Sequence, residues 1–272
     1  MWAITARSIG LCSVSTTSQS KPRAARASAA NGSGRFSHVP ITALPSLSFR
    51  FTGFDWLVVD TEHSPIDLAA MAHMFQAIGR FPTAPLVRIP WNNEENIKRV
   101  LDAGAWGFVA PNVRSREEAE LVVAAAKYPP RGIRSLGGGR HHLSFKTDPT
   151  TYYERANDEI VVVIQIEHID AVRKIDDILS VPGADACFIG PNDLCASMGL
   201  APSLEPPHRE FEEAIQTIKR SALKHGVPPG IHCATPETVN RRIAEGWRFM
   251  GILGDVRFLT AGAKAARDAI KV

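Results

Sequence analysis

The chain has 272 residues, of which 44% are hydrophobic and 22% are charged, so it is long enough to bury a substantial core. Its formal net charge of +3 is unevenly spread: residues 1–54 contain six basic residues and no acidic one, and the other 25 basic residues accompany all 28 acidic residues. The body is thus slightly acidic without a basic stripe, and no apolar run reaches the about 18–20 residues that span a bilayer, so neither a nucleic acid nor a membrane is an expected partner.

The first 40 residues differ in composition from the rest. They are rich in Ser, Ala, Thr and Arg and lack acidic residues, a composition that cannot pack a core. We therefore predict a disordered or transit-like segment at residues 1–40 (a mispredicted exon fits equally) and a folded domain at residues 41–272. The four cysteines form no C-x-x-C pair, which is typical of reduced thiols in the cytoplasm. A mitochondrial location is the alternative that the N-terminal segment suggests.

After residue 54, short runs rich in Val, Ile and Leu alternate with longer amphipathic segments. The predicted strands are 56–60, 85–90, 107–113, 160–167, 186–191, 228–233 and 249–254. The predicted helices are 65–79, 93–104, 115–128, 170–181, 210–226 and 235–246. Ser115 and Glu118 form a capping box at the start of the third helix. Apolar strands that alternate with helices predict a parallel sheet covered by helices.

The number of strands favours a barrel. Seven strands in about 200 residues suit a (β/α)8 TIM barrel better than a doubly wound sheet, and no G-x-G-x-x-G motif follows the early strands. An eighth strand should precede residue 56, but only residues 41–51 are available and they form a poor strand candidate with little room for a helix. We therefore predict an α/β fold, a (β/α)8 TIM barrel with an atypical or incomplete first β/α unit.

Polar residues collect where the predicted strands end, which is where a barrel of this kind places its catalytic groups. The chain has D-T-E-H at 60–63, an arginine at 88, Q-I-E-H at 165–168 and G-P-N-D at 190–193. Each group alone has a structural explanation, such as a helix cap or a buried ion pair. Four strand ends that supply complementary groups at one face favour a functional site.

The residue types at these ends suggest metal-assisted proton transfer. Glu167 and Asp193 follow consecutive strands, and two carboxylates with open positions suit a hard divalent ion such as Mg²⁺ or Mn²⁺. Arg88, inside an apolar run, needs an anionic partner or ligand. His63 is the natural proton-transfer group, because imidazole titrates near neutral pH. Asp102, near the end of a helix that precedes a strand, is either structural or orients His63.

Six motifs occur in this order between residues 54 and 255: VVDTEHSP, LVRIP, VLDAGAWGFVAPNV, AKYPPRGIRSLGG, VVVIQIEH and FIGPNDLCASMG. Together they resemble the HpcH/HpaI aldolases, class II pyruvate aldolases of the phosphoenolpyruvate/pyruvate barrel superfamily, especially those acting on 4-hydroxy-2-oxo-heptane-dioate and 2-keto-3-deoxy sugar acids. The resemblance implies reversible cleavage of a 4-hydroxy-2-oxo acid to pyruvate and an aldehyde through a metal-stabilised pyruvate enolate. The implied cofactor is a divalent metal ion, Mg²⁺, Mn²⁺ or Co²⁺. The N-terminus departs from the family, whose clear first strand and helix are missing here.

The resemblance also assigns roles to individual residues. The implied metal ligands are Glu167 and Asp193, with Asp60 near the metal-bound waters. The implied catalytic residues are His63, Arg88 and Asp102. The implied substrate-binding residues are Gln165, Gly190, Pro191, Asn192 and Arg88. No predicted strand ends in a lysine, which fits a metal-dependent rather than a Schiff-base aldolase.

The resemblance further implies a homo-oligomer, a trimer or hexamer with exchanged C-terminal helices. The segment 261–272 would then pack on a neighbouring subunit, and Arg140 in the glycine-rich loop would reach a neighbouring site. From the residues alone we expect His141 and His142 to be exposed loop residues, and Trp91 and Trp106 to be packing residues. Two alternatives stay open: an acyl-CoA lyase of the citrate lyase beta or malyl-CoA lyase type, and a non-catalytic barrel scaffold.

Overall fold

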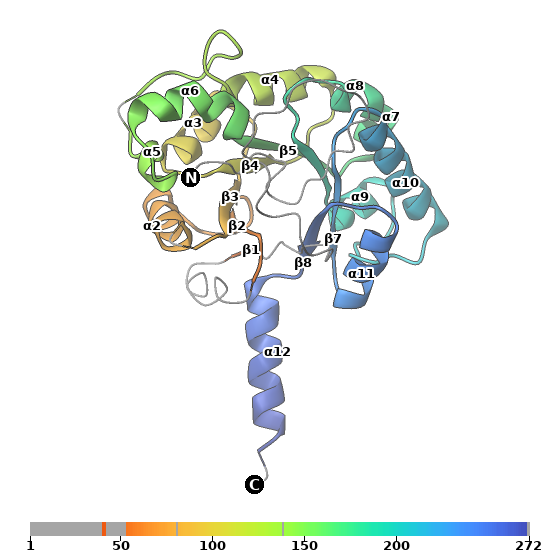
Figure 1. Cartoon of the computed structure of the whole chain (residues 1–272). Coiled ribbons are helices and arrows are strands. Elements are labelled where there is room, and N and C mark those ends of the chain that lie inside the picture. Colours follow the sequence, from red (N-terminus) through yellow and green to blue (C-terminus); the bar gives the residue numbers. More distant parts are fainter. Residues whose placement is uncertain (1–39, 42–52, 80, 138, 271–272) are drawn as a thin grey trace.

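A parallel sheet with helices packed around it forms the body of the protein (Figure 1). The computed structural model describes residues 40–41, 53–79, 81–137 and 139–270. Residues 1–39, which carry most of the predicted disordered or transit-like segment, lie outside the described residues. No helix in the described part of the chain is long and apolar enough to cross a membrane.

Eight strands lie in the sheet in chain order, and each pairs in parallel with the next. They are β1 (Pro40–Ile41), β2 (Trp56–Asp60), β3 (Ala84–Arg88), β4 (Gly107–Ala110), β5 (Val161–Ile166), β6 (Ala186–Ile189), β7 (Pro229–Cys233) and β8 (Phe249–Ile252). The seven predicted strands are confirmed, most of them ending earlier than predicted because the pairing stops where the polar loops begin. β1 lies at the start of the segment proposed for the missing strand, and residues 42–52 are outside the described part.

The helices follow the strands. They are α2 (Leu68–Ile78), α3 (Glu94–Asp102), α4 (Arg116–Ala126), α5 (His141–Ser144), α6 (Pro149–Glu159), α7 (Ile169–Arg173), α8 (Ile175–Leu179), α9 (Pro191–Ser197), α10 (Arg209–Lys224), α11 (Pro236–Ala244) and α12 (Asp255–Asp268). The single helix predicted at 170–181 is wrong, because the helix breaks at Lys174 into α7 and α8. Ser115 caps α4 by accepting the N–H of Glu118 at 3.3 Å, as the sequence predicts.

Side chains inside the curve of the sheet show how strongly it curls. One hydrophobic cluster contains interior residues of β2 to β6 and of β8: Trp56, Val58, Ala84, Leu86, Val109, Val161, Val163, Ala186, Phe188 and Phe249. Trp56 on β2 stacks on Phe249 on β8 with ring centroids 3.9 Å apart and planes 5° apart. The sheet therefore bends far enough to bring its first and last long strands together (Figure 1). Among the described residues, no ladder joins β8 to β1.

Two expectations about side-chain packing are wrong. Trp91 is 68% exposed in the loop after β3, so it does not pack in the core. His141 is buried at 1% exposure, because its ring packs on Tyr152 with centroids 4.4 Å apart. Trp106, by contrast, is buried and stacks on Phe145, as predicted.

The C-terminal helix α12 projects away from the body (Figure 1). Asp255, its first residue, is its only buried residue, and Val256, Leu259 and the following Ile270 are 56%, 65% and 67% exposed. Val256 and Leu259 lie three positions apart, so they form one exposed apolar stripe on the first turns of the helix. A stripe of this kind is typical of a surface that another element covers.

The stack between β2 and β8 yields a stability prediction. Phe249→Ala should lower the free energy of unfolding by about 3–5 kcal/mol, because it removes a fully buried ring and leaves a cavity against Trp56. Urea unfolding followed by circular dichroism measures the change. Leu223→Ala, at a 57% exposed position, is the control and should change it by less than about 0.5 kcal/mol. Equal effects of the two substitutions would contradict the packing role of Phe249.

Candidate functional site

A cavity of about 330 Å³ opens at the carboxyl ends of the strands. Its apolar floor is formed by Val58, Val109 and Phe188, which belong to the interior cluster of the sheet. The predicted site residues that line it are His63, Arg88, Gln165, Glu167, Gly190, Pro191, Asn192 and Asp193. The strand ends thus bring these side chains to one cavity, as the arrangement of a parallel sheet requires.

A second, more open groove of about 480 Å³ lies between α10 and α11. Its buried Arg242 pairs with Glu212 at 2.8 Å and with Glu245 at 3.0 Å. These charges satisfy one another, so the groove is held by a structural ion-pair cluster. The cavity at the strand ends is therefore the candidate site.

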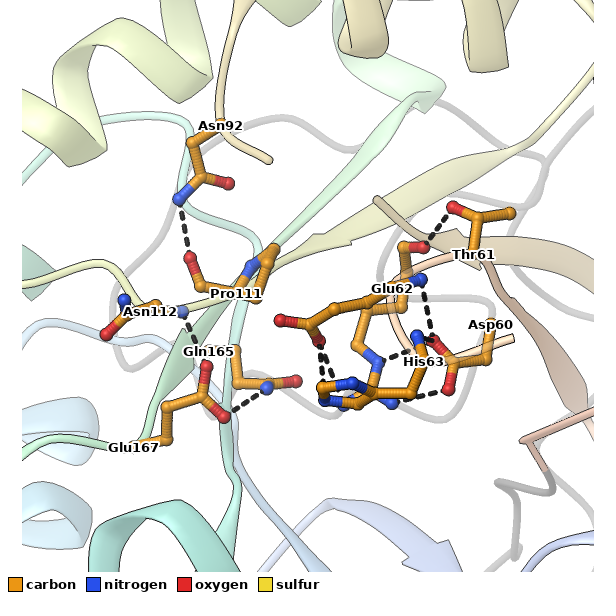
Figure 2. Close-up of polar contacts among 10 residues, drawn as sticks. Asp60, Thr61, Glu62, His63, Asn92, Pro111, Asn112, Gln165 and Glu167 are labelled. Carbon is orange, nitrogen blue, oxygen red and sulfur yellow. Dashed lines mark hydrogen bonds and ion pairs between the residues drawn. The ribbon is translucent and has the colours of Figure 1, made fainter. Parts of the chain in front are cut away.

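Glu167 is fixed at the end of β5 by two hydrogen bonds (Figure 2). Its Oε1 accepts the backbone N–H of Asn112 at 2.7 Å, and its Oε2 accepts a short hydrogen bond from Gln165 Nε2. Asn112 can aim its N–H this way because its backbone is left-handed, with φ of 53°, a conformation that Asn tolerates better than most residues. The turn after β4 and the end of β5 therefore both fix the orientation of the Glu167 carboxylate.

Gly190 leaves the space that Glu167 occupies. A Cβ atom at this position would lie 2.6 Å from Glu167 Oε2 and 3.2 Å from Glu167 Cβ. A side chain at residue 190 would therefore displace the carboxylate. The glycine of the G-P-N-D motif is required for this close approach.

The charge around Glu167 is negative and poorly compensated. Burial, together with the charges of Glu62 and Asp193, raises the pKa of Glu167 to about 7. Burial also raises the pKa of Glu62, although Arg88 and His63 act against this. The carboxyl groups of Glu62, Glu167 and Asp193, which follow β2, β5 and β6, thus repel one another.

Arg88 is held by the turn that follows β2. Its Nε donates to Asp60 Oδ1 at 2.9 Å, its Nη2 pairs with Asp60 Oδ2 at 2.5 Å, and its Nη1 lies 3.2 Å from Glu62 Oε2. Burial alone would raise the pKa of Asp60, but the hydrogen bonds and charge of Arg88 hold it below its usual value. A bidentate pair of this kind fixes the plane of the guanidinium group. Asp60 therefore orients Arg88, which itself lines the cavity.

His63 lines the cavity and lies beside Glu62 (Figure 2). Its side chain is 64% exposed, and its Nε2 lies 3.6 Å from Glu62 Oε2. The backbone N–H groups of Glu62 and His63 point to Asp60 Oδ1 at 3.1 and 3.4 Å, so the aspartate also shapes the turn that carries the imidazole. His63 is placed where it can exchange protons with both solvent and cavity.

Within one chain the structure does not bring Asp102 to His63. Asp102 is the last residue of α3, a helix that leads into β4, so it lies toward the amino ends of the strands. There it accepts a hydrogen bond from Arg134 Nη2 at 2.8 Å and lies 3.9 Å from His141 Nδ1. Of the two interpretations of Asp102, the structural one fits the contacts of a single chain. Arg140, at the start of α5, is exposed.

The donor set of the cavity suits a hard divalent cation. Among the described residues, no group of three or more His, Cys, Asp and Glu side chains is arranged to hold a metal ion. Glu167 and Asp193 nevertheless line one cavity. A cation bound between these two carboxylates would relieve the repulsion of Glu167 from Asp193 and Glu62. Mg²⁺ is commonly held by one or two carboxylates, with water and substrate oxygens as its other ligands. The residues present therefore fit such an ion.

Several residues of the site were not predicted as site residues from the sequence. Glu62 lies in the D-T-E-H motif itself, beside the residues that were selected. Asn112 acts through its backbone, and its only signal is the Pro111-Asn112 pair directly after β4. His232 and Leu204 also line the cavity. His232 is the next-to-last residue of β7, and the rule that selected polar residues at the other strand ends would have found it.

Comparisons with known proteins indicate the family of the chain. The model of the HpcH/HpaI aldolase/citrate lyase family matches residues 46–251. The 4-hydroxy-2-oxo-heptane-1,7-dioate aldolase of Klebsiella pneumoniae is 38% identical over 213 residues, which cover 78% of this chain and 80% of the relative.

Solved structures show the same likeness. The HpcH/HpaI aldolase from Desulfitobacterium hafniense superimposes with a TM-score of 0.78 at 31% identity, covering 87% of this chain and 92% of that one. An HpcH/HpaI aldolase/citrate lyase family protein from Burkholderia cenocepacia gives a TM-score of 0.79 at 27% identity, covering 85% and 92%.

The contribution of Glu167 to the stability of the metal-free protein should fall as the pH rises from about 4.5 to about 7. Glu167 has a folded pKa of about 7 against an ordinary value of 4.5. The folded state therefore binds more protons than the unfolded state in this window, and the unfolding free energy falls as the pH rises. The loss is about 3 kcal/mol at most.

Glu167→Gln should remove this contribution, because the amide does not titrate, so the difference in unfolding free energy between wild type and variant should change across this pH window. Chemical denaturation in EDTA at several pH values measures it, with Glu210→Gln at an exposed position as the control. An unchanged pH dependence in Glu167→Gln would show that another group is responsible.

Proposed function

We propose a function for this chain from its family, because it belongs to the HpcH/HpaI aldolase/citrate lyase family. It is a class II aldolase that reversibly cleaves a 4-hydroxy-2-oxo acid to pyruvate and an aldehyde. The observation that carries this proposal is the joining of Glu167, Asp193, Arg88 and His63 in one cavity at the carboxyl ends of the strands. The stack of Trp56 on Phe249 supports a sheet that closes as a (β/α)8 barrel over residues 41–272.

Glu167 and Asp193 are the residues that would hold the divalent ion, Mg²⁺, Mn²⁺ or Co²⁺. When bound, the ion supplies a Lewis acid to the 2-oxo and carboxylate oxygens of the substrate. Gln165 and the N–H of Asn112 keep the Glu167 carboxylate in a single orientation. The fixed carboxylate does not have to reorganise when substrate enters.

The start of α9 is suited to the substrate carboxylate. The helix begins at Pro191, and Gly190 before it offers no side-chain cap. Proline has no N–H, so the N–H groups of Asn192 and Asp193 are the first donors available to an anion there. Gln165, one strand away, lines the same cavity and would contact the 2-oxo acid.

Two side chains would perform the proton and charge chemistry. Arg88, fixed by Asp60, would place its guanidinium beside the oxygen that gains negative charge when the carbon–carbon bond breaks. His63 would take the proton from the C4 hydroxyl in cleavage and return it in condensation. Its exposure would let it exchange that proton with water. Asp60 is better placed to position Arg88 than to contact the metal's water shell.

Assembly would complete the arrangement. The exposed apolar stripe of α12 supports a homo-oligomer, a trimer or hexamer, in which this helix packs on another copy of the chain. In such an assembly Asp102 and Arg140, which lie away from the cavity of their own chain, would serve a neighbouring site. The aspartate would then orient a neighbour's His63.

Deuterium exchange into the methyl group of pyruvate tests the proposed chemistry. The protein with Mg²⁺ or Mn²⁺ should catalyse it, and EDTA or Glu167→Ala should abolish it, because the carbanion is then unstabilised. An acyl-CoA lyase would not exchange free pyruvate, and a scaffold would exchange nothing. Full activity with EDTA or in Glu167→Ala would overturn the metal mechanism.

Substitution of His63 distinguishes its role in proton transfer from metal binding. His63→Ala should slow cleavage of a 4-hydroxy-2-oxo acid by about 10²–10⁴-fold while Mn²⁺ affinity stays unchanged. His73→Ala, at an exposed position on α2, is the matched control. A wild-type cleavage rate in His63→Ala would refute its role.

The assembly can be tested through α12. Substituting Val256 and Leu259 by Ser should shift the protein to smaller species in sedimentation velocity, because both side chains belong to the exposed apolar stripe. Lys264→Ser on the same helix is the control. An unchanged sedimentation coefficient in the double variant would contradict the proposed role of the helix.

A further inference from the structure

His232 has a place in the cavity that the proposed reaction does not use. Residues Gly230 and Ile231 on β7 pair with Phe188 and Ile189 on β6, so His232 is level with Gly190. By the pairing of β5 with β6, Glu167 is also level with Gly190. The imidazole and the proposed metal carboxylate therefore flank a position without a side chain, and His232 forms part of the cavity wall there.

The ring of His232 also has a fixed partner outside the cavity. Its Nε2 lies 3.0 Å from the backbone oxygen of Leu253. Burial, with Arg88 nearby, lowers the pKa of His232 to about 4, so the imidazole is neutral near pH 7. A carbonyl oxygen can only accept a hydrogen bond, so Nε2 carries the proton and donates it to Leu253.

Leu253 is the hinge between β8 and α12. It has a φ of 47°, a left-handed conformation that is uncommon for a leucine. Its N–H donates to the Cys233 oxygen at 3.1 Å. His232 and Cys233, two successive residues of β7, therefore bind the backbone C=O and N–H of Leu253. Gly254 follows, and α12 begins at Asp255. The backbone conformation of Leu253 therefore lies in the short connection that sets how α12 leaves β8.

We propose that His232 is a positioning residue that couples the contents of the cavity to the hinge of α12. The ring lines the cavity, and its Nε2 donates a hydrogen bond to the backbone oxygen of Leu253. A ligand in the cavity that changes the position of the ring therefore also changes the backbone position of Leu253. Coupling between two sites is reciprocal. Packing of α12 on a second copy of the chain would thus change the affinity of the cavity for its ligand. The ligand part of this inference rests on the proposed function.

Hydrogen–deuterium exchange, followed by mass spectrometry, tests the hinge without any ligand. His232→Leu should raise exchange at residues 253–258 by about tenfold, the equivalent of one hydrogen bond, and His232→Gln, which keeps an amide donor, should restore it. Leu253→Asn, which tolerates the left-handed conformation, should reduce the effect of His232→Leu. Unchanged exchange at β4 and β5 shows that each variant is folded. Unaltered exchange at 253–258 in folded His232→Leu would overturn the proposal.

A second arm measures the coupling with Mg²⁺ and pyruvate. In the wild type, pyruvate should lower exchange at 253–258; in His232→Leu this response should be lost, although pyruvate still protects residues 190–193. A response that persists in His232→Leu, or is absent in the wild type while 190–193 are protected, overturns the coupling. Failure of pyruvate to protect 190–193 would instead count against the proposed function, and the ligand-free arm would still decide the hinge.

Discussion

A buried carboxylate beside two others is the constraint on which the site depends. Glu167 is held by the N–H of Asn112 and by Gln165, and these contacts orient it without removing its repulsion from Glu62 and Asp193. Arg88, a cation that lines the same cavity, is already paired with Asp60. The cavity is therefore preorganised for an added cation, because its negative charge is fixed in place and only partly compensated.

The sheet supplies the accuracy that this arrangement needs. Parallel pairing places the ends of β5, β6 and β7 at one level, and the absence of a side chain at Gly190 lets Glu167 reach across β6. The interior stack of Trp56 on Phe249 joins β2 to β8 across the inside of the curled sheet. The position of the carboxylate thus depends on packing as well as on local hydrogen bonds.

The sequence predicted the elements that have a clear periodicity or a motif. The strand 56–60 was predicted to the residue, because its apolar run ends in Asp60. Contacts that depend on tertiary packing were not predictable: Trp91 is exposed and His141 is buried because of what surrounds them, and the pairing of Asp102 with Arg134 joins residues 32 positions apart. Asn112 was missed because it acts through its backbone, which no side-chain pattern reveals.

The most direct test of the account is the position of the metal ion. A crystal grown with Mn²⁺ and oxalate, a planar dianion like the expected intermediate, would be measured for anomalous scattering at the manganese edge. The account predicts one strong peak about 2.0–2.3 Å from carboxylate oxygens of both Glu167 and Asp193. An anomalous peak away from these two carboxylates, or no peak in the cavity at saturating Mn²⁺, would contradict the account.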